Sequence, residues 1–431
     1  MRSASCCAAC VLGGLLLATV PAPAGPGEDD ARWVGTWASA PQLTEEANLP
    51  PAPGLADTTL RQVVHVSIGG QRLRVRFSNA YGTAALTLVS AHVARSAGGS
   101  AIHAGTGRAL AFHGQPSVTI PAGALVVSDP LDLDLPPLSD LAVTVYLRGA
   151  PADVTGHPGS RTTSYLQAGN AVAATDLPAA ARVDHWYFLS GIEVRAGRSA
   201  AAVAILGDSI TDGRGSTTNG NDRWPDNLAR RLQANPATRE VAVLNQGIGG
   251  NRLLRDGLGP NVLARLDRDV LAQAGVRWLI VLEGINDIGA RVRARERGEP
   301  WATAQDLIAA LEQIVVRAHA RGIRAYGATI LPYEGATSYF TVDGEADRQA
   351  VNAWIRNSGV FDGVIDFDAA TRDRERPSRL SPAVDGGDHL HPSAAGYRIM
   401  ADAVDLGLFA EPLRPVCLNP TREPCRQGLA R

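Results

Sequence analysis

The second half of the chain is dominated by five short apolar runs that alternate with helical patterns. Between consecutive runs, apolar residues recur at three- and four-residue spacing, which is typical of amphipathic helices. Strands that alternate with helices form a parallel sheet with right-handed crossovers. We therefore expect an α/β fold here, with helices covering both faces of a parallel sheet. The runs are 203–206, 241–244, 278–282, 325–331 and 364–367.

Helix start signals support this interpretation. Trp224-Pro225 places a proline where a first helical turn tolerates it. Thr303 and Asp306 are spaced like a capping box, and Ser393 precedes a final helical stripe. The predicted helices thus fall between or after the predicted strands, as a parallel sheet requires.

The preceding part of the chain reads as all-β. Apolar residues alternate with polar ones over 64–68 and again over 73–77, with Gly69-Gly70 between them, and we interpret this as a hairpin. Frequent proline and glycine breaks favour a sandwich or jelly roll. Its arginine row is interpreted as a solvated face. That row consists of Arg72, Arg74 and Arg76.

Aromatic and histidine residues of this β-rich part are interpreted as structural. The Trp33 to Trp37 stretch, together with Trp186, could stack on sugars, but we favour the core because tryptophan is usually buried. The histidines, His157 among them, show no metal-ligand spacing, so we assign them structural or surface positions.

The N-terminus resembles a targeting segment. Arg2 is followed by the apolar run 11–20, which is too short to span a bilayer, and Ala22-Pro23-Ala24 fits a cleavage site before Gly25. We expect an exported protein, secreted or periplasmic, without a stable membrane anchor. The predicted organisation is a signal peptide (1–24), a β-rich accessory domain (25–198), an α/β domain (199–411) and a C-terminal tail (412–431).

The cysteines agree with export. Cys6, Cys7 and Cys10 lie inside the predicted signal peptide. Cys417 and Cys425 remain as a close pair, which in an oxidising compartment would form a disulfide that staples the tail. Metal ligation by this pair is the alternative, but it lacks a companion pair or a nearby histidine.

Composition excludes some classes of partner. Net charge is -2, apolar content is 45% and the chain contains no lysine. Neither a nucleic-acid footprint nor a polybasic membrane patch is indicated, so we expect no nucleic-acid partner.

The most informative polar segment follows the first run of the α/β part. It reads Leu206-Gly207-Asp208-Ser209-Ile210, a buried strand that gives way to a turn. Open α/β sheets place their chemistry beyond the carboxyl ends of strands, so Ser209 is a candidate nucleophile. A helix-capping turn is the structural alternative.

A second segment supplies a candidate base. Asp388 stands three residues before His391, where its carboxylate can orient the imidazole, whereas His389 has Gly386 at that offset. Serine, oriented histidine and aspartate together make an activated nucleophile. A divalent-metal site is the alternative, because histidines and carboxylates are ordinary ligands. Its ligands would be Asp385, Asp388, His389 and His391.

Acyl transfer also needs donors for the developing oxyanion. The N–H groups of Ser209 and Gly250 and the side-chain amide of Asn286 could supply three. Glycine suits this task because its backbone approaches a substrate closely. Gly249 is adjacent and remains an alternative to Gly250.

With these residues the chain resembles the SGNH or GDSL hydrolase family. Ser209 in Gly-Asp-Ser, Gly250, Asn286 in Gly-x-Asn-Asp and His391 in Asp-x-x-His match the family's four hallmarks in order, with Asp388 as third triad member. The resemblance covers about 201–409. It implies an SGNH-like parallel sheet, a Ser209-His391-Asp388 triad, an oxyanion hole of Ser209, Gly250 and Asn286, and no metal or organic cofactor.

Segments 212–215 and 221–225 also look like a secreted bacterial subgroup that carries a β-rich domain before the hydrolase domain. Ile210 stands where the family's nickname has leucine, in a position where members vary. We expect Asp208 and Asp287 to brace the loops behind the site.

The sequence therefore predicts an exported serine esterase acting on small or polymeric esters, with short-chain or acetyl esters and acetylated glycans as candidate substrates. Two other functions stay open at this point. One is a lipase or phospholipase acting on lipid esters. The other is a glycan-binding protein with a degenerate hydrolase domain.

Overall fold

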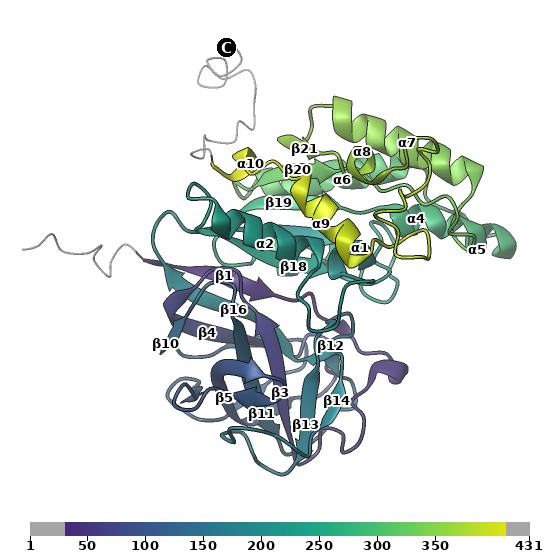
Figure 1. Ribbon diagram of the computed structural model, residues 1–431. Coiled ribbons are helices and arrows are strands. Elements are labelled where there is room, and N and C mark those ends of the chain that lie inside the picture. The colour runs from purple at the N-terminus through teal and green to yellow at the C-terminus, as the bar shows by residue number, and fades with distance from the viewer. Residues whose placement is uncertain (1–30, 411–431) are drawn as a thin grey trace, which may run out of the picture.

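The computed structural model describes residues 31–410. The predicted signal peptide and the cysteines Cys417 and Cys425 lie outside these residues, so export and the disulfide stay predictions. Within 31–410, no helix has the length and apolar character needed to cross a bilayer. The chain folds into an antiparallel β-rich part followed by an α/β part. In Figure 1 the β-rich part lies below the α/β part. The predicted fold class is confirmed.

The α/β part is built on a parallel five-stranded sheet with the order β18-β17-β19-β20-β21. Each strand matches one of the five apolar runs. Their side chains are buried because helices cover both faces, which explains why the runs are apolar rather than alternating. The strands are β17 (Ala201–Gly207), β18 (Val241–Gly247), β19 (Val276–Leu282), β20 (Arg324–Ala328) and β21 (Gly363–Ile365).

The helices begin where the sequence signals place them. Trp224 and Pro225 open α2, Thr303 and Asp306 form the capping box of α6, and Ser393 caps α9. The helices are α1 (Ser209–Asp212), α2 (Trp224–Ala234), α3 (Val262–Leu266), α4 (Ile285–Gly289), α5 (Arg291–Arg297), α6 (Ala304–His319), α7 (Val342–Asn357), α8 (Phe367–Thr371), α9 (Ala394–Asp402) and α10 (Gly407–Ala410), with a π-helical turn η3 (Asp267–Leu271) after α3.

The β-rich part contains two large antiparallel sheets and one small one. Their orders are β1-β16-β4-β10, β14-β13-β3-β11-β5-β6 and β15-β12-β2, with β9 paired to β4, and β7 and β8 paired to β5. The strands are β1 (Arg32–Ala38), β2 (Gln42–Leu43), β3 (Thr58–His65), β4 (Gly70–Ser78), β5 (Leu86–Gly98), β6 (Ala101–Ile102), β7 (Arg108–Ala109), β8 (Val118–Ile120), β9 (Leu125–Val127), β10 (Leu131–Leu135), β11 (Asp140–Leu147), β12 (Thr155–His157), β13 (Ser164–Ala168), β14 (Ala181–Val183), β15 (Trp186–Tyr187) and β16 (Leu189–Ala196); η2 (Glu46–Asn48) is a 3-10 turn.

The predicted hairpin over 64–77 is wrong. Strands β3 and β4 follow one another in the chain but belong to different sheets, where β3 pairs with β11 and β13, and β4 pairs with β16, β10 and β9. Gly69-Gly70 therefore carries the chain from one sheet to the other. Apolar alternation predicts strands, but a turn signal between two strands does not decide whether they pair.

The arginine row of β4 is a solvated face only at Arg72, which is exposed, whereas Arg74 and Arg76 are held by partners in the protein. Arg74 donates to Glu193 Oε2 at 2.5 Å and lies over the ring of Trp33, with 4.4 Å from Cζ to the centroid. Arg76 is 7% exposed and donates to Gln273 Oε1 at 2.9 Å. Because β4 pairs with β16, Glu193 lies across from Arg74, and this partner is invisible in the sequence of β4 alone. Trp37 and Trp186, in contrast, are core residues as expected, with ring centroids 4.8 Å apart.

The two parts share a packed interface. Val34 of β1 lies in one apolar cluster with Ala242 and Leu244 of β18, and the Gly35 N–H donates to the Ala274 carbonyl at 2.9 Å. Figure 1 shows β1 running alongside the lower edge of the α/β part. The β-rich part is therefore packed directly against the sheet that carries the site. The predicted boundary at 198/199 falls between β16 and β17 and stays a prediction of domain organisation.

Candidate active site

Ser209 lies where strand β17 of the parallel sheet ends and the short helix α1 begins. Asp208 caps that helix, and its Oδ1 accepts the N–H of Ile210 at 2.9 Å. Gly213 ends the helix with φ of 99°, a conformation that favours glycine. The chain therefore turns sharply on both sides of α1, which leaves Ser209 at the rim of the sheet.

His391 joins Ser209 and Asp388 in one hydrogen-bonded chain. The Asp388 carboxylate accepts from the His391 ring at Nδ1 (2.7 Å) and from the His391 backbone N–H (2.8 Å). With its proton on Nδ1, the ring presents Nε2 as an acceptor for the Ser209 hydroxyl at 2.8 Å. The structure thus brings together the three residues that the sequence nominated, in the arrangement that a serine nucleophile requires.

His389 does not share this arrangement. Its Nδ1 lies 2.5 Å from Asp385 Oδ2, and its ring is largely exposed. The two histidine–aspartate pairs are therefore separate, and the four residues of the metal alternative do not converge. Throughout residues 31–410, no group of three or more histidine, cysteine, aspartate and glutamate side chains is arranged to hold a metal ion.

The three predicted oxyanion donors line the same cleft, which has a volume of about 820 Å³. Ser209 N–H is at the first position of α1, where no helical carbonyl reaches it. Gly250 has φ of 69°. Asn286 belongs to α4 and is 4% exposed, and its Nδ2 has no hydrogen-bond partner among the described residues. A buried amide nitrogen without a partner is costly unless a ligand accepts from it.

Gly249 and Gly250 both line the cleft, and neither N–H donates a hydrogen bond within residues 31–410. The choice of Gly250 therefore stays a prediction.

Tyr339 is a site residue that the sequence analysis missed. Its hydroxyl donates to Asn286 Oδ1 at 3.1 Å. This bond fixes the orientation of the amide, and Nδ2 of the same amide, which has no partner within residues 31–410, stays free to donate to a substrate oxygen. The ring packs so closely on α4 that a Cβ at Gly289 would lie 2.0 Å from Tyr339 Cδ1. Tyr339 stands 53 residues after Asn286 and in no motif, so only the fold reveals the pair. It is a positioning residue for the predicted oxyanion donor.

Replacing Tyr339 with phenylalanine tests this position. The ring stays packed against Gly289, but Asn286 loses the donor that fixes its amide orientation. We expect kcat for an aryl acetate to fall about tenfold and KM to stay nearly unchanged. A tenfold loss of rate corresponds to about 1.4 kcal/mol, which is within the usual contribution of one hydrogen bond. Steady-state kinetics of Tyr339→Phe provide the measurement, and Tyr333→Phe is the matched control. An unchanged kcat would contradict the positioning role.

Buried carboxyl groups lie behind the nucleophile and the amide. Burial raises the pKa of Asp208 to about 7 and that of Asp287 to about 6. Asp287 accepts the N–H groups of Leu253 and Leu254 at 2.9 and 3.3 Å, so it ties α4 to the segment that follows β18. Glu283, at the end of β19, was not nominated by the sequence; burial raises its pKa well above the ordinary value, and it lies 3.7 Å from Arg265. These contacts are consistent with the predicted bracing roles of Asp208 and Asp287.

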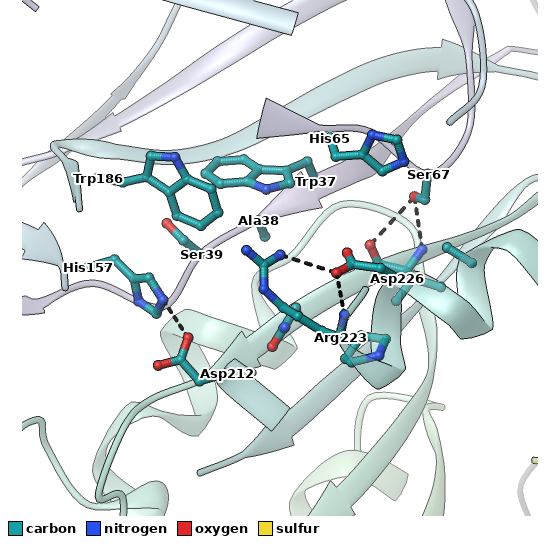
Figure 2. Close-up of a pocket in the computed structure, with 14 residues that line it drawn as sticks. Trp37, Ala38, Ser39, His65, Ser67, His157, Trp186, Asp212, Arg223 and Asp226 are labelled. Atoms are coloured by element: carbon teal, nitrogen blue, oxygen red, sulfur yellow. Dashed lines mark hydrogen bonds and ion pairs between the residues drawn. The ribbon is translucent and has the colours of Figure 1, made fainter. Parts of the chain in front are cut away.

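The β-rich part contacts α1, the helix that begins with Ser209, through His157. His157, at the end of β12, places Nε2 2.8 Å from Asp212 Oδ1 (Figure 2). Its Nδ1 lies 2.9 Å from the Ala40 carbonyl oxygen. The His157 side chain thus bridges the Ala40 carbonyl oxygen and the Asp212 carboxyl group, and so joins the β-rich part to α1. His157 and Asp212 are nearly fully buried, and Asp212 is the last residue of α1.

Further contacts secure this junction. The His157 ring stacks on Trp186, with ring centroids 5.7 Å apart (Figure 2). Arg223, which lines the same small cavity, donates to Asp226 (Figure 2). Arg223 also donates to the Ser160 carbonyl. The structural role expected for His157 is thus met, but its partner lies 55 residues away in the hydrolase part.

Removing His157 leaves the Asp212 carboxyl group buried without this hydrogen-bond partner. We expect His157→Ala to lower the free energy of unfolding by about 3 kcal/mol, the upper end of the cost of leaving a buried polar group unsatisfied. Urea denaturation followed by circular dichroism gives the value. The exposed His113→Ala serves as control, and equal stability of both variants would show that the pair contributes nothing.

Comparison with known proteins agrees with this site. Residues 205–399 match the profile of the GDSL-like Lipase/Acylhydrolase family. This part of the chain is a GDSL/SGNH hydrolase domain, preceded by the β-rich part. The family is one of carboxylic ester hydrolases, so the protein is an enzyme of that class. The resemblance stated from the motifs is confirmed.

Solved structures with a similar fold cover about half of this chain. A lipolytic protein of the G-D-S-L family from Desulfitobacterium hafniense is 20% identical, with a TM-score of 0.35, 47% of this chain covered and 97% of that chain covered. A GDSL-like lipase from Bacteroides thetaiotaomicron is 18% identical (TM-score 0.34, 47% and 84% covered). An acetyl xylan esterase from Geobacillus stearothermophilus is 24% identical (TM-score 0.36, 48% and 94% covered). No curated protein sequence matches the chain significantly.

Proposed function

We propose that the protein is an exported serine esterase that cleaves short-chain acyl or acetyl esters through an acyl-enzyme. The observation that carries the proposal is the unbroken hydrogen-bonded chain Ser209–His391–Asp388. It lies in the same cleft as Asn286, whose amide nitrogen Nδ2 has no partner among the described residues. Export is proposed from the N-terminal sequence alone.

The reaction follows from the geometry. His391 Nε2 takes the Ser209 proton while Ser209 Oγ attacks the ester carbonyl carbon, and Asp388 stabilises the imidazolium that forms. The oxyanion accepts from Ser209 N–H, Gly250 N–H and Asn286 Nδ2. When the tetrahedral intermediate collapses, the alcohol leaves with the proton from His391. Water then attacks the acyl-enzyme by the same route, with its proton passing to His391, and Ser209 is released with the acid.

The lining of the cleft supports a short acyl group and a polar alcohol. Its aliphatic lining residues are Pro158, Leu258, Ala336 and Leu390, and Leu258 is 57% exposed. A long acyl chain would find little apolar surface there. Residues of the β-rich part, such as Gln42 and His185, line the same cleft, so a polymeric substrate could contact both parts of the molecule. Acetylated glycans are therefore the polymer class we propose.

The proposal is tested by a chain-length series of 4-nitrophenyl esters, run beside acetyl release from acetylated xylan and pectin. We expect kcat/KM to be highest for acetate or propionate and to fall steadily beyond butyrate. Highest activity on long-chain or phospholipid esters would instead identify a lipase or phospholipase. Ser209→Ala is the background control in every arm.

The pH dependence follows from His391. Burial lowers the pKa of His391 below the ordinary histidine value of 6.5, Asp388 opposes that shift, and Arg214 and Arg161 add to it. The ring must be neutral to take the serine proton, so activity is lost as pH falls through this pKa. We expect the acid limb of kcat/KM for 4-nitrophenyl acetate to have its midpoint below pH 6.5. A midpoint at or above 6.5 would contradict the lowered pKa of His391, and a profile without an acid limb would contradict its assignment as base.

A further inference from the structure

Three arginines line the active-site cleft without a carboxylate partner. Arg161 comes from the β-rich part, Arg214 follows α1, and Arg293 belongs to α5. Within residues 31–410, none of the three forms an ion pair, and the buried Nε of Arg161 has no hydrogen-bond partner. Arg161 is half-buried and Arg214 and Arg293 are exposed, whereas most buried arginines of residues 31–410, for example Arg265 and Arg348, are paired with acids.

The positive charge reaches the reacting groups. Arg214 and Arg161 line the same cleft as His391, and their charges add to the effect of burial in lowering the pKa of its ring. The whole chain has a net charge of -2, so this grouping is not a consequence of a basic protein. Free guanidinium groups around a cleft favour anionic ligands, which they bind with charge-assisted and often bidentate hydrogen bonds.

A second pocket, of about 150 Å³, adjoins the cleft through Arg293, which lines both. It adds Arg252, Arg255 and Arg297, and the Nε of Arg252 is also buried without a partner. Trp301 lines this pocket and is 41% exposed, with Arg291 held 5.6 Å from its ring. An exposed indole face beside guanidinium groups suits a sugar ring that carries an acid, because the ring packs on the apolar sugar face.

The carboxylates along these two pockets are mostly engaged elsewhere. Asp388 and Asp212 are bonded to His391 and His157, and Glu45 accepts from the amides of Gln42 and Asn48. Asp287 is held by two backbone N–H groups. Glu299 lines the second pocket as well. Most of these carboxylates thus already accept from donors of the protein, whereas Arg161, Arg214 and Arg293 form no ion pair within residues 31–410, so the ionic groups left available to a ligand are mainly guanidinium groups.

We propose that the cleft and the adjoining pocket form one binding track for an esterified acidic polysaccharide. Arg161 and Arg214 bind a uronate carboxylate next to the ester that Ser209 attacks. Arg293, Arg252 and Arg297 bind carboxylates further along the chain, and Trp301 packs on a sugar face. The inference rests on the proposed esterase function and adds the charge of the substrate. An anionic phospholipid offers the same charge, but the polar cleft provides little surface for its acyl chains.

The charge preference is measured with a matched pair of small esters, 3-acetoxybenzoate and its neutral methyl ester. We expect the wild type to favour the anion in kcat/KM. Arg161→Gln and Arg214→Gln should each lower the ratio of anion to neutral ester about tenfold, as expected for a lost charge-assisted hydrogen bond. Arg321→Gln, at an exposed site outside both pockets, is the control and should leave the ratio unchanged.

The length of the track is measured by acetyl release from acetylated oligogalacturonides and acetylated xylo-oligosaccharides. We expect a preference for the acidic oligomer that increases with its length and weakens with added salt. Arg293→Gln, Arg297→Gln and Trp301→Ala should reduce the preference for long oligomers more than that for the benzoate probe. Folding of each variant is checked by its thermal unfolding curve.

The outcomes separate the two levels of the proposal. If the wild type hydrolyses neither 4-nitrophenyl acetate nor any other ester, the proposed esterase function fails. If it hydrolyses neutral esters with no preference for the anion, or if the arginine variants keep the wild-type ratio, only the acidic-substrate inference is overturned. Faster fatty-acid release from phosphatidylglycerol vesicles than acetyl release from oligogalacturonides also overturns it, in favour of a lipid substrate.

Discussion

Ser209→Ala is expected to lower kcat for 4-nitrophenyl acetate by at least about 10⁴-fold. The hydroxyl lies 2.8 Å from His391 Nε2 at the N-terminus of α1, and within the cleft it is the nucleophile that this base can activate. Without Oγ no acyl-enzyme forms. Any remaining hydrolysis must come from water acting with the oxyanion donors, which in serine hydrolases retains a small part of the rate enhancement.

The matched control is Ser216→Ala. Ser216 lies seven residues further along the same loop, and its hydroxyl donates to the Gly213 carbonyl at 2.6 Å, away from His391. The account predicts near wild-type turnover for this variant. If both variants kept wild-type turnover, a nucleophile other than Ser209 would have to carry the reaction.

The second large effect is expected for Asp388→Asn, with kcat reduced about 10⁴-fold. Hydrogen bonds from the backbone and ring of His391 lower the pKa of Asp388 in spite of burial, so the carboxylate is ionised throughout the working range. An asparagine amide can donate to Nδ1, which moves the ring proton to Nε2. That tautomer cannot accept the Ser209 proton.

Asp385→Asn provides an unusually close control. Asp385 holds His389 as Asp388 holds His391, by a carboxylate on Nδ1, but His389 does not contact Ser209. We expect this variant to retain most of the activity, with thermal unfolding used to confirm that both variants are folded. A larger loss for Asp385→Asn than for Asp388→Asn would transfer the role of base to His389.

The sequence predicts the α/β part well because its signals are local. A parallel strand buried on both faces reads as a continuous apolar run, and caps such as Thr303 and Ser393 mark helix starts within three residues. The site segments lie at strand ends or in short loops, and open α/β sheets gather such ends on one edge. Ser209, Asn286 and His391 could therefore be nominated together from motifs alone.

The missed features all depend on pairing between distant segments. Strand β4 leaves β3 to pair with β16, and this exchange decides that Arg74 meets Glu193. His157 meets Asp212 only because the β-rich part packs against α1. Tyr339 meets Asn286 through the packing of its ring on Gly289. Periodicity and turn propensity carry no information about such partners, since they report on one segment at a time.

The most direct test of the central claim is covalent labelling with a fluorophosphonate, located by peptide mass spectrometry. The account predicts one modified residue, Ser209, with labelling strongly slowed in His391→Ala and retained in His389→Ala. A protein that hydrolyses esters but carries the label on another residue, or takes none at Ser209, would contradict the assignment of the nucleophile.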